Sequence, residues 1–160
     1  MQLQFREEVP DVAALQARGA DLIVAADGVN SLVRRTYADA FGYQGDVRSN
    51  HYIWLGTTRL FDAFSFIFVE TPAGVYQVHA YRFNERQSAF IVECDDASWR
   101  AAGFDAMNAA ETIAACEQMF APWLDGHRLE FNATPHRVRD PWGTFLRVTC
   151  ERGRHENISL

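Results

Sequence analysis

Residues 21–34 read Asp-Leu-Ile-Val-Ala-Ala-Asp-Gly-Val-Asn-Ser-Leu-Val-Arg, and this stretch decides the fold of the N-terminal part of the chain. The unbroken apolar run after Asp21 is typical of a strand that is buried on both faces, as in a parallel sheet. Asp27-Gly28 ends that strand in a turn, and either Asn30 or Ser31 is a suitable N-cap for a helix at 31–40. The stretch therefore predicts a strand–turn–helix unit.

The same unit has the chemistry of a corner that binds anions or hydroxyl groups. A glycine at position 28 lets the backbone come close to a ligand, and the first turn of the helix offers free N–H groups. Asp27 can accept hydrogen bonds from hydroxyl groups, and the Arg34 guanidinium can pair with a phosphate or with Asp27. The alternative is an ordinary junction, because Asp-Gly is common in turns.

Working outward, the chain predicts further short elements. Met1, Leu3 and Phe5 alternate with polar residues, as in a half-buried strand, and residues 11–18 fit a short helix that ends at Gly19. The last residues, 157–160, are again strand-like. Because both ends are strand-like with no turn outside them, we expect a piece of a longer polypeptide.

The middle of the chain, from His51 to Cys94, is rich in aromatic and β-branched residues. After a linker at 42–50, it predicts four strands in an antiparallel meander, at residues 52–57, 64–70, 75–83 and 88–94. Alternation places Gln77, His79 and Tyr81 on one face of their strand. Phe64, Phe66 and Phe68 share one face of the preceding strand, and this stripe is expected to be core rather than pocket.

Helices are expected after the sheet. Residues 95–102 fit a short helix, and the acidic cluster of Glu93, Asp95 and Asp96 is expected to be its solvated cap. Asn108 with Glu111 forms a capping box for a helix to about Phe120. Ile113, Cys116 and Phe120 would share its buried face, and residues 145–150 read as a strand. The fold class is therefore α+β, an antiparallel sheet with flanking helices.

Composition excludes several classes of protein. The chain has 160 residues, 48% of them hydrophobic, and a formal net charge of −6 without a dense basic block, which argues against nucleic-acid binding. No apolar run approaches the length of a membrane span. The three cysteines stand far apart and the histidines are scattered, so neither a disulfide framework nor a metal site is expected, and a reducing cytoplasm is the simplest setting.

The run from Ala26-Asp27-Gly28 to Ser31 and Arg34 resembles the Asp-Gly fingerprint of the FAD-dependent aromatic hydroxylases of the para-hydroxybenzoate hydroxylase type. Segments at 52–57, 77–83 and 98–103 are similar to one subgroup, the salicylyl-CoA and anthraniloyl-CoA monooxygenases. The resemblance implies FAD and NAD(P)H as cofactors, and a small aromatic substrate such as an aryl-CoA thioester.

The resemblance also assigns roles to residues. In this family an antiparallel sheet covers the aromatic ring beside the flavin, so His79 and Tyr81 are the catalytic candidates, His79 for proton transfer. A hydrogen-bonded structural histidine is the alternative. Trp54, Phe68 and Gln77 are the candidates for substrate binding, although packing is the alternative role for Trp54. Asp27, Gly28 and Arg34 are the candidates for cofactor binding.

The domains follow from the same resemblance. We expect part of a Rossmann-like FAD-binding domain at 1–45, the substrate-binding domain at 46–145, and a return toward the FAD-binding domain at 146–160. The Gly-x-Gly-x-x-Gly fingerprint for the flavin pyrophosphate is absent from the sequence. The alternatives are therefore a truncated, non-catalytic substrate-binding module, or a relative among the FAD halogenases and epoxidases.

Overall fold

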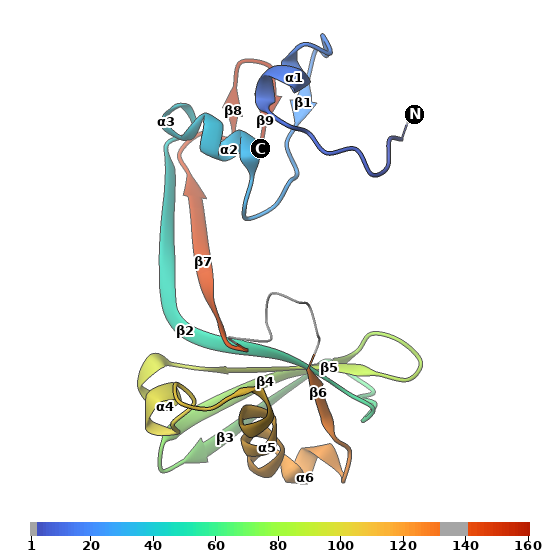
Figure 1. Ribbon diagram of the computed structural model, residues 1–160, viewed down its shortest axis with the longest axis vertical. Helices are drawn as coiled ribbons and strands as arrows, with labels where there is room; N and C mark the ends of the chain where they lie inside the picture. The colour runs from blue at the N-terminus through green and yellow to red at the C-terminus, as the bar shows by residue number, and fades with distance from the viewer. Residues whose placement is uncertain (1–2, 132–140) are drawn as a thin grey trace. The chain divides into compact units, whose positions relative to one another are not determined.

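The computed structural model describes residues 3–131 and 141–160. Helices and strands are mixed, and the strands of the larger sheet are antiparallel, which confirms the α+β class (Figure 1). By their internal contacts the residues divide into two compact units, 1–47 with 146–160, and 48–145. The assignment of a flavin domain and a substrate domain to such parts stays a prediction.

The first unit is a small sheet with three short helices. Its elements are α1 (Val12–Gln16), β1 (Ile23–Val24), α2 (Leu32–Thr36), α3 (Ala38–Phe41), β8 (Arg154–His155) and β9 (Ile158–Ser159). The strand order is β1-β9-β8, with β1 parallel to β9. Its buried centre consists of Val12, Val33, Phe41 and Ile158.

Two strand predictions in this unit are wrong. Residues 3–5 form no strand, and the side chains of Leu3 and Phe5 are exposed, since no neighbouring strand pairs with them among the described residues. β1 is short and is not buried on both faces: Val24 is 65% exposed. The reason is that none of the described elements covers the side of the sheet on which Val24 lies.

The predicted helix at 31–40 is interrupted. Ser31 is the N-cap, as expected, but Tyr37 has φ −114° and ψ 39°, outside the helical region, and separates α2 from α3. α1 begins after its N-cap Asp11, close to the expected position.

The second unit is built on the larger sheet. It contains β3 (Ser65–Thr71), β4 (Gly74–Arg82), β5 (Ser88–Cys94) and β6 (Leu129–Phe131), together with most of the paired part of β2 (Tyr43–Thr57). The strand order is β3-β4-β5-β2-β6, and β7 (Gly143–Cys150) also pairs with β2.

The predicted ranges of β3, β4 and β5 are confirmed to within one residue, but β2 begins before the predicted residue 52, and the order of a simple meander is wrong. β2 pairs with β5, from His51 opposite Cys94 to Thr57 opposite Ser88, and is not a neighbour of β3. The predicted linker at 42–50 is also wrong, since residues 43–50 belong to β2. β2 pairs with β7, a strand about a hundred residues later, and this pairing provides partners for its backbone N–H and C=O groups. No local sequence pattern indicates a partner so far away.

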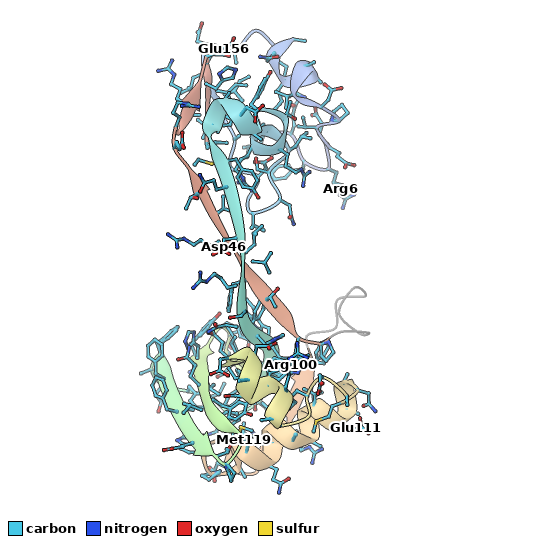
Figure 2. The ribbon with its side chains drawn as sticks, turned by 90° about the vertical axis from the view of Figure 1, so that its left-hand side faces the viewer. Arg6, Asp46, Arg100, Glu111, Met119 and Glu156 are labelled. Atoms are coloured by element: carbon cyan, nitrogen blue, oxygen red, sulfur yellow. The ribbon has the colours of Figure 1, made fainter. Side chains whose placement is uncertain are left out.

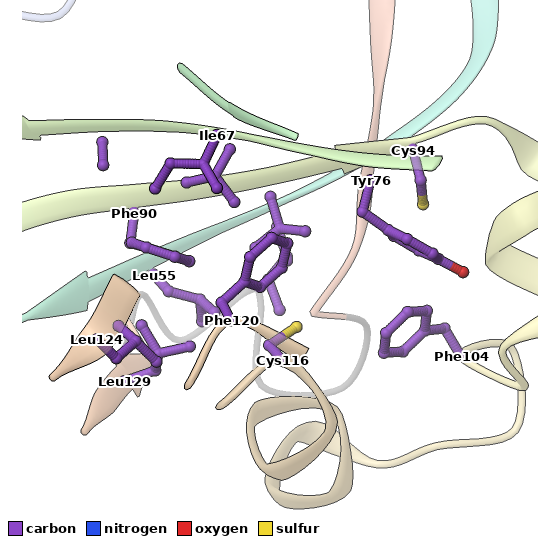
Figure 3. Close-up of a cluster of buried hydrophobic side chains, with 14 of the residues drawn as sticks. Leu55, Ile67, Tyr76, Phe90, Cys94, Phe104, Cys116, Phe120, Leu124 and Leu129 are labelled. Atoms are coloured by element: carbon purple, nitrogen blue, oxygen red, sulfur yellow. The ribbon is translucent and has the colours of Figure 1, made fainter. Parts of the chain in front are cut away.

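Three helices cover one face of this sheet (Figures 1 and 2). They are α4 (Asp96–Ala101), α5 (Ala109–Met119) and α6 (Ala121–Leu124). The caps are as predicted: the Asp95 carboxylate accepts from Ser98 N, and Asn108 and Glu111 form the capping box. Between helices and sheet lies the main core, shown in Figure 3, in which Phe90 and Phe120 meet edge to face at 5.5 Å.

The cysteines of this core behave as small apolar residues. Cys94 and Cys116 are buried, and burial raises the pKa of each thiol to about 12. They therefore stay protonated at neutral pH. Within residues 3–131 and 141–160 no cluster of His, Cys, Asp and Glu could hold a metal ion, and no helix is long and apolar enough to cross a membrane.

No helix formed by the described residues covers the other face of the sheet, and we call this face the open face. Phe64, Phe66 and Phe68 lie on it, with exposed fractions of 56%, 60% and 61%. The expectation that this stripe belongs to the core is wrong. Alternation gives the core side of β3 to Ile67 and Val69, so the phenylalanines must face the opposite way.

Two phenylalanines on opposite faces test this arrangement. Phe90→Ala removes a fully buried ring and should lower the free energy of unfolding by about 3–5 kcal/mol. Phe66→Ala removes an exposed ring and should change it by about 0.5 kcal/mol. Chemical denaturation of both variants measures the difference. Equal losses would contradict the open face.

Candidate functional site

The turn after β1 is held by hydrogen bonds to the start of α2. The Asp27 carboxylate accepts from Leu32 N–H at 2.7 Å, and the Ser31 hydroxyl accepts from Arg34 N–H at 3.0 Å. The Ser31 N–H donates to Gly28 O at 3.1 Å. These bonds satisfy N–H groups that a helix start leaves unpaired, so the turn and the helix form one unit.

Arg34 points back into this turn rather than outward. Its guanidinium donates to the carbonyl oxygen of Gly28 at 3.2 Å and to that of Val29. It also lies over the Tyr43 ring, 5.3 Å from the centroid, and the residue is only 8% exposed. The sequence suggested a phosphate or Asp27 as its partner. In the structure Arg34 instead shapes the loop that carries Asp27 and Gly28.

Gly28 leaves space beside the turn. Its φ is +79°, a conformation that other residues adopt only with strain, and a Cβ placed there would meet nothing within 4 Å. Asp27 is exposed next to it. A mainly apolar hollow of about 460 Å³ adjoins Asp27, and Ala25, Ala26 and Leu32 are among its lining residues. A ligand can therefore reach the Asp27 carboxylate and the Gly28 backbone together.

The hydrogen bonds also set the charge of Asp27. Partial burial acts to raise the pKa of its carboxyl, but hydrogen bonds from the Ser31 hydroxyl and the Leu32 N–H outweigh that effect and leave the pKa below its ordinary value of 3.8. Asp27 is therefore a carboxylate at neutral pH and acts as a hydrogen-bond acceptor.

The open face brings together the other candidates. Strand register aligns Phe66, His79, Ile91 and Trp54 in one row across β3, β4, β5 and β2. The next row consists of Phe68, Gln77, Glu93 and Tyr52. Tyr81 follows in the row of Ala89 and Gly56. All five predicted substrate-side residues, His79, Tyr81, Trp54, Phe68 and Gln77, thus lie on one face of one sheet.

A polar group stands at the centre of this face. Gln77 Nε2 donates to the Glu93 carboxylate at 3.1 Å and lies 3.4 Å from His79 Nε2. His79 Nδ1 lies 3.7 Å from the other Glu93 oxygen. With the amide and the imidazole in this arrangement, Nδ1 carries the proton toward Glu93 and Nε2 is the acceptor. The histidine is partnered at both nitrogens.

Aromatic rings surround the polar group. Phe64 stacks on Tyr81 with ring centroids 5.2 Å apart and planes at 7°, and Phe66 meets His79 edge to face at 4.8 Å. Trp54 is 43% exposed. Such a surface offers flat apolar area for a planar ring, with hydrogen-bonding groups beside it.

Two hollows lie along this face. One, of about 210 Å³, is lined by residues that include Phe68, Gln77 and Glu93. The other, of about 320 Å³, includes Trp54 and Glu130. A larger hollow of about 540 Å³ lies at the β4–β5 turn, where polar residues line it, and contains no candidate residue.

Sequence reasoning missed Glu93, which it interpreted as part of a solvated helix cap. The signal was present, because alternation along 88–94 puts Glu93 on the same face as Ile91 and opposite the buried Val92. Two other described histidines of this unit have partners elsewhere: His51 stacks on Trp99 on the helix side, and His127 bonds to Thr58. His136 lies outside the described residues.

Comparison with known proteins finds that the chain is similar to segments of several monooxygenases. It is 40% identical over 140 residues to salicyloyl-CoA 5-hydroxylase of a Streptomyces species, covering 82% of this chain and 27% of that protein. It is 44% identical over 140 residues to 3-hydroxy-4-methyl-anthranilyl-[aryl-carrier protein] 5-monooxygenase of Streptosporangium sibiricum, covering 88% of this chain and 34% of that protein. It is 30% identical over 153 residues to protodeoxyviolaceinate monooxygenase of Chromobacterium violaceum, covering 94% and 39% respectively.

Solved structures agree on the fold. The tetrameric form of 2-methyl-3-hydroxypyridine-5-carboxylic acid oxygenase matches with a TM-score of 0.56 at 18% identity, over 88% of this chain and 37% of that one. No family model matches the chain. The chain is thus homologous to one segment of these monooxygenases, and it spans between 27% and 39% of the length of these curated relatives.

The role of Arg34 can be tested by a conservative change. Arg34→Lys keeps the charge but cannot donate to the carbonyl groups of Gly28 and Val29 together. We expect a loss of about 1–3 kcal/mol in the free energy of unfolding, with faster amide exchange in the Asp27–Ser31 turn. Arg35→Lys, at an exposed neighbour, is the control. Equal effects in the two variants would show that Arg34 does not hold the turn.

Asp27 should make the free energy of unfolding depend on pH in the acid range. A carboxyl whose pKa is lower in the folded state stabilises the fold above its unfolded pKa, and this contribution is lost as the pH falls through the folded pKa. Asp27→Asn should therefore lose less stability than the parent chain between pH 5 and pH 2. Denaturation midpoints at several pH values measure this, with the exposed Asp21→Asn as control. Parallel curves for Asp27→Asn and the parent chain would contradict the prediction.

Proposed function

We propose that this chain is the substrate-binding part, with one corner of the flavin-binding part, of an FAD-dependent monooxygenase that hydroxylates an aromatic ring with NAD(P)H and O₂. The observation that carries the proposal is the open face, on which aromatic side chains surround Gln77, His79 and Glu93. Homology to segments of two hydroxylating enzymes for aryl thioesters supports it.

The proposed substrate is a small aromatic acyl group carried as a thioester. The names of two relatives specify a CoA thioester and an aryl group on a carrier protein. On this chain the ring would lie against Phe66, Phe68 and Trp54, whose exposed side chains offer apolar area. Gln77 and His79 would meet the polar substituents of the ring.

His79 is proposed to manage a proton. A phenol or aniline becomes more electron-rich as it loses a proton, which favours attack by an electrophilic oxygen. His79 Nε2, which lies 3.4 Å from the Gln77 amide, would take the proton once the substrate displaces that amide, and Glu93 beside Nδ1 would stabilise the imidazolium that forms. Tyr81, stacked on Phe64, would bound the ring on the adjoining row.

The turn at Asp27 fits a cofactor with hydroxyl groups. The exposed carboxylate can accept hydrogen bonds from a flavin's sugar-like chain, and Gly28 leaves room for close approach. Arg34 would serve the cofactor indirectly, by holding the carbonyl groups of the loop. The flavin itself, when bound, supplies the oxygen chemistry. The three unpaired cysteines suit a reducing cytoplasm, which we propose as the compartment.

Ligand titration of the chain tests the proposal. Salicyloyl-CoA should shift the NMR signals of Trp54, Gln77 and His79, whereas CoA alone should leave them in place. His79→Ala should weaken binding about three- to tenfold through lost contact, and His127→Ala, at the Thr58 contact, should not. Shifts confined to the helix-covered face, or equal shifts with CoA alone, would overturn the proposal.

A further inference from the structure

We infer that Glu93 determines specificity at the open face: it rejects an aromatic ring that bears a free carboxylate and admits a ring whose carboxyl is masked as a neutral thioester or amide. The inference rests on the proposed function, since it concerns the ring that this face would bind. It concerns the charge that the bound ring can carry, and the aromatic side chains of the face do not determine that charge.

At the register-paired positions of β2 to β6, the described side chains on the open face carry more negative than positive charge. Strand register and alternation bring three carboxylates to this side, Glu70 on β3, Glu93 on β5 and Glu130 on β6. Within the described residues, the register-paired positions of β2 to β6 place no lysine or arginine on it. Arg82, the last residue of β4, falls on the core side of the alternation and bonds to Asn84 O.

Glu93 is the carboxylate at the centre of the face, and its position is fixed. Its side chain is only 15% exposed. One oxygen accepts from Gln77 at 3.1 Å, and the other lies 3.7 Å from His79 Nδ1. A partly desolvated charge in a fixed place acts on a nearby ligand charge more strongly than a mobile surface carboxylate does.

The adjoining hollow adds a second carboxylate. Phe68, Gln77 and Glu93 line it together with Asp95. Hydrogen bonds from the Ser98 backbone and hydroxyl lower the pKa of Asp95, so this group is also charged at neutral pH. A free carboxylate on the ring would thus face two like charges. A neutral carbonyl of similar shape would not.

The test compares two ligands of nearly equal shape, salicylamide and salicylate, by NMR titration of the chain at neutral pH. Salicylamide should bind at least about tenfold more tightly than salicylate, with shifts at Trp54, Gln77 and His79. Glu93→Gln keeps the size of the side chain and should lower the ratio of the two dissociation constants at least about threefold, with Asp95 left as the remaining like charge. Glu85→Gln, at the β4–β5 turn, removes the same charge elsewhere and should leave the ratio unchanged.

A second measurement needs no variant. Raising the salt concentration from 20 mM to 500 mM should tighten salicylate binding, because screening weakens repulsion, and should leave salicylamide binding nearly constant. Equal affinities in the parent chain, or an unchanged ratio in Glu93→Gln, would overturn the inference while leaving the proposed function intact. Absence of shifts on the open face with either ligand would overturn both.

Discussion

The structure of the larger unit depends on the burial of one face of its sheet and not of the other. Helices α4, α5 and α6 close over Tyr76, Val78, Phe90 and Val92, and this contact supplies the main core of the chain. Because side chains alternate along a strand, each buried residue places its neighbours on the opposite side. The packing that stabilises the sheet thereby also fixes the array of rings and polar groups on the open face.

The smaller unit reaches its arrangement by hydrogen bonding rather than by a large core. Its buried centre has four residues, and the turn at Asp27 is defined by bonds from Leu32, Ser31 and Arg34. The guanidinium of Arg34, the cation of the motif, donates its hydrogen bonds to carbonyl groups of the loop. What remains for a ligand is the carboxylate of Asp27 and the free space beside Gly28.

Local signals in the sequence were sufficient for much of this fold. The capping box at Asn108, the strand at 88–94 and the helix start at Ser31 were all predictable, because each depends on residues a few positions apart. The pairing of β2 with β5 and β7 was not, since partners distant in sequence leave no mark on local periodicity. The prediction that Phe66 belongs to the core was wrong for a related reason. Alternation separates the two faces of a sheet but does not indicate which of them the helices cover.

The candidate site, too, was only partly predictable from local sequence patterns. Gln77, His79 and Tyr81 were grouped correctly on one face by alternation alone, and the register then added Trp54 and Phe68 from other strands. Glu93 was within reach of the same argument but was set aside as a helix cap. Whether these residues bind or act on a ring stays a prediction.

The separation of the two faces affects which substitutions such a sheet can tolerate during evolution. A substitution at an exposed position such as Phe66 or Trp54 removes little buried area, so it puts the fold at little risk. Phe90 lies on the opposite, helix-covered face of the sheet, and a substitution there destabilises the whole unit. New ring preferences can therefore accumulate on one side of a scaffold whose other side is held constant.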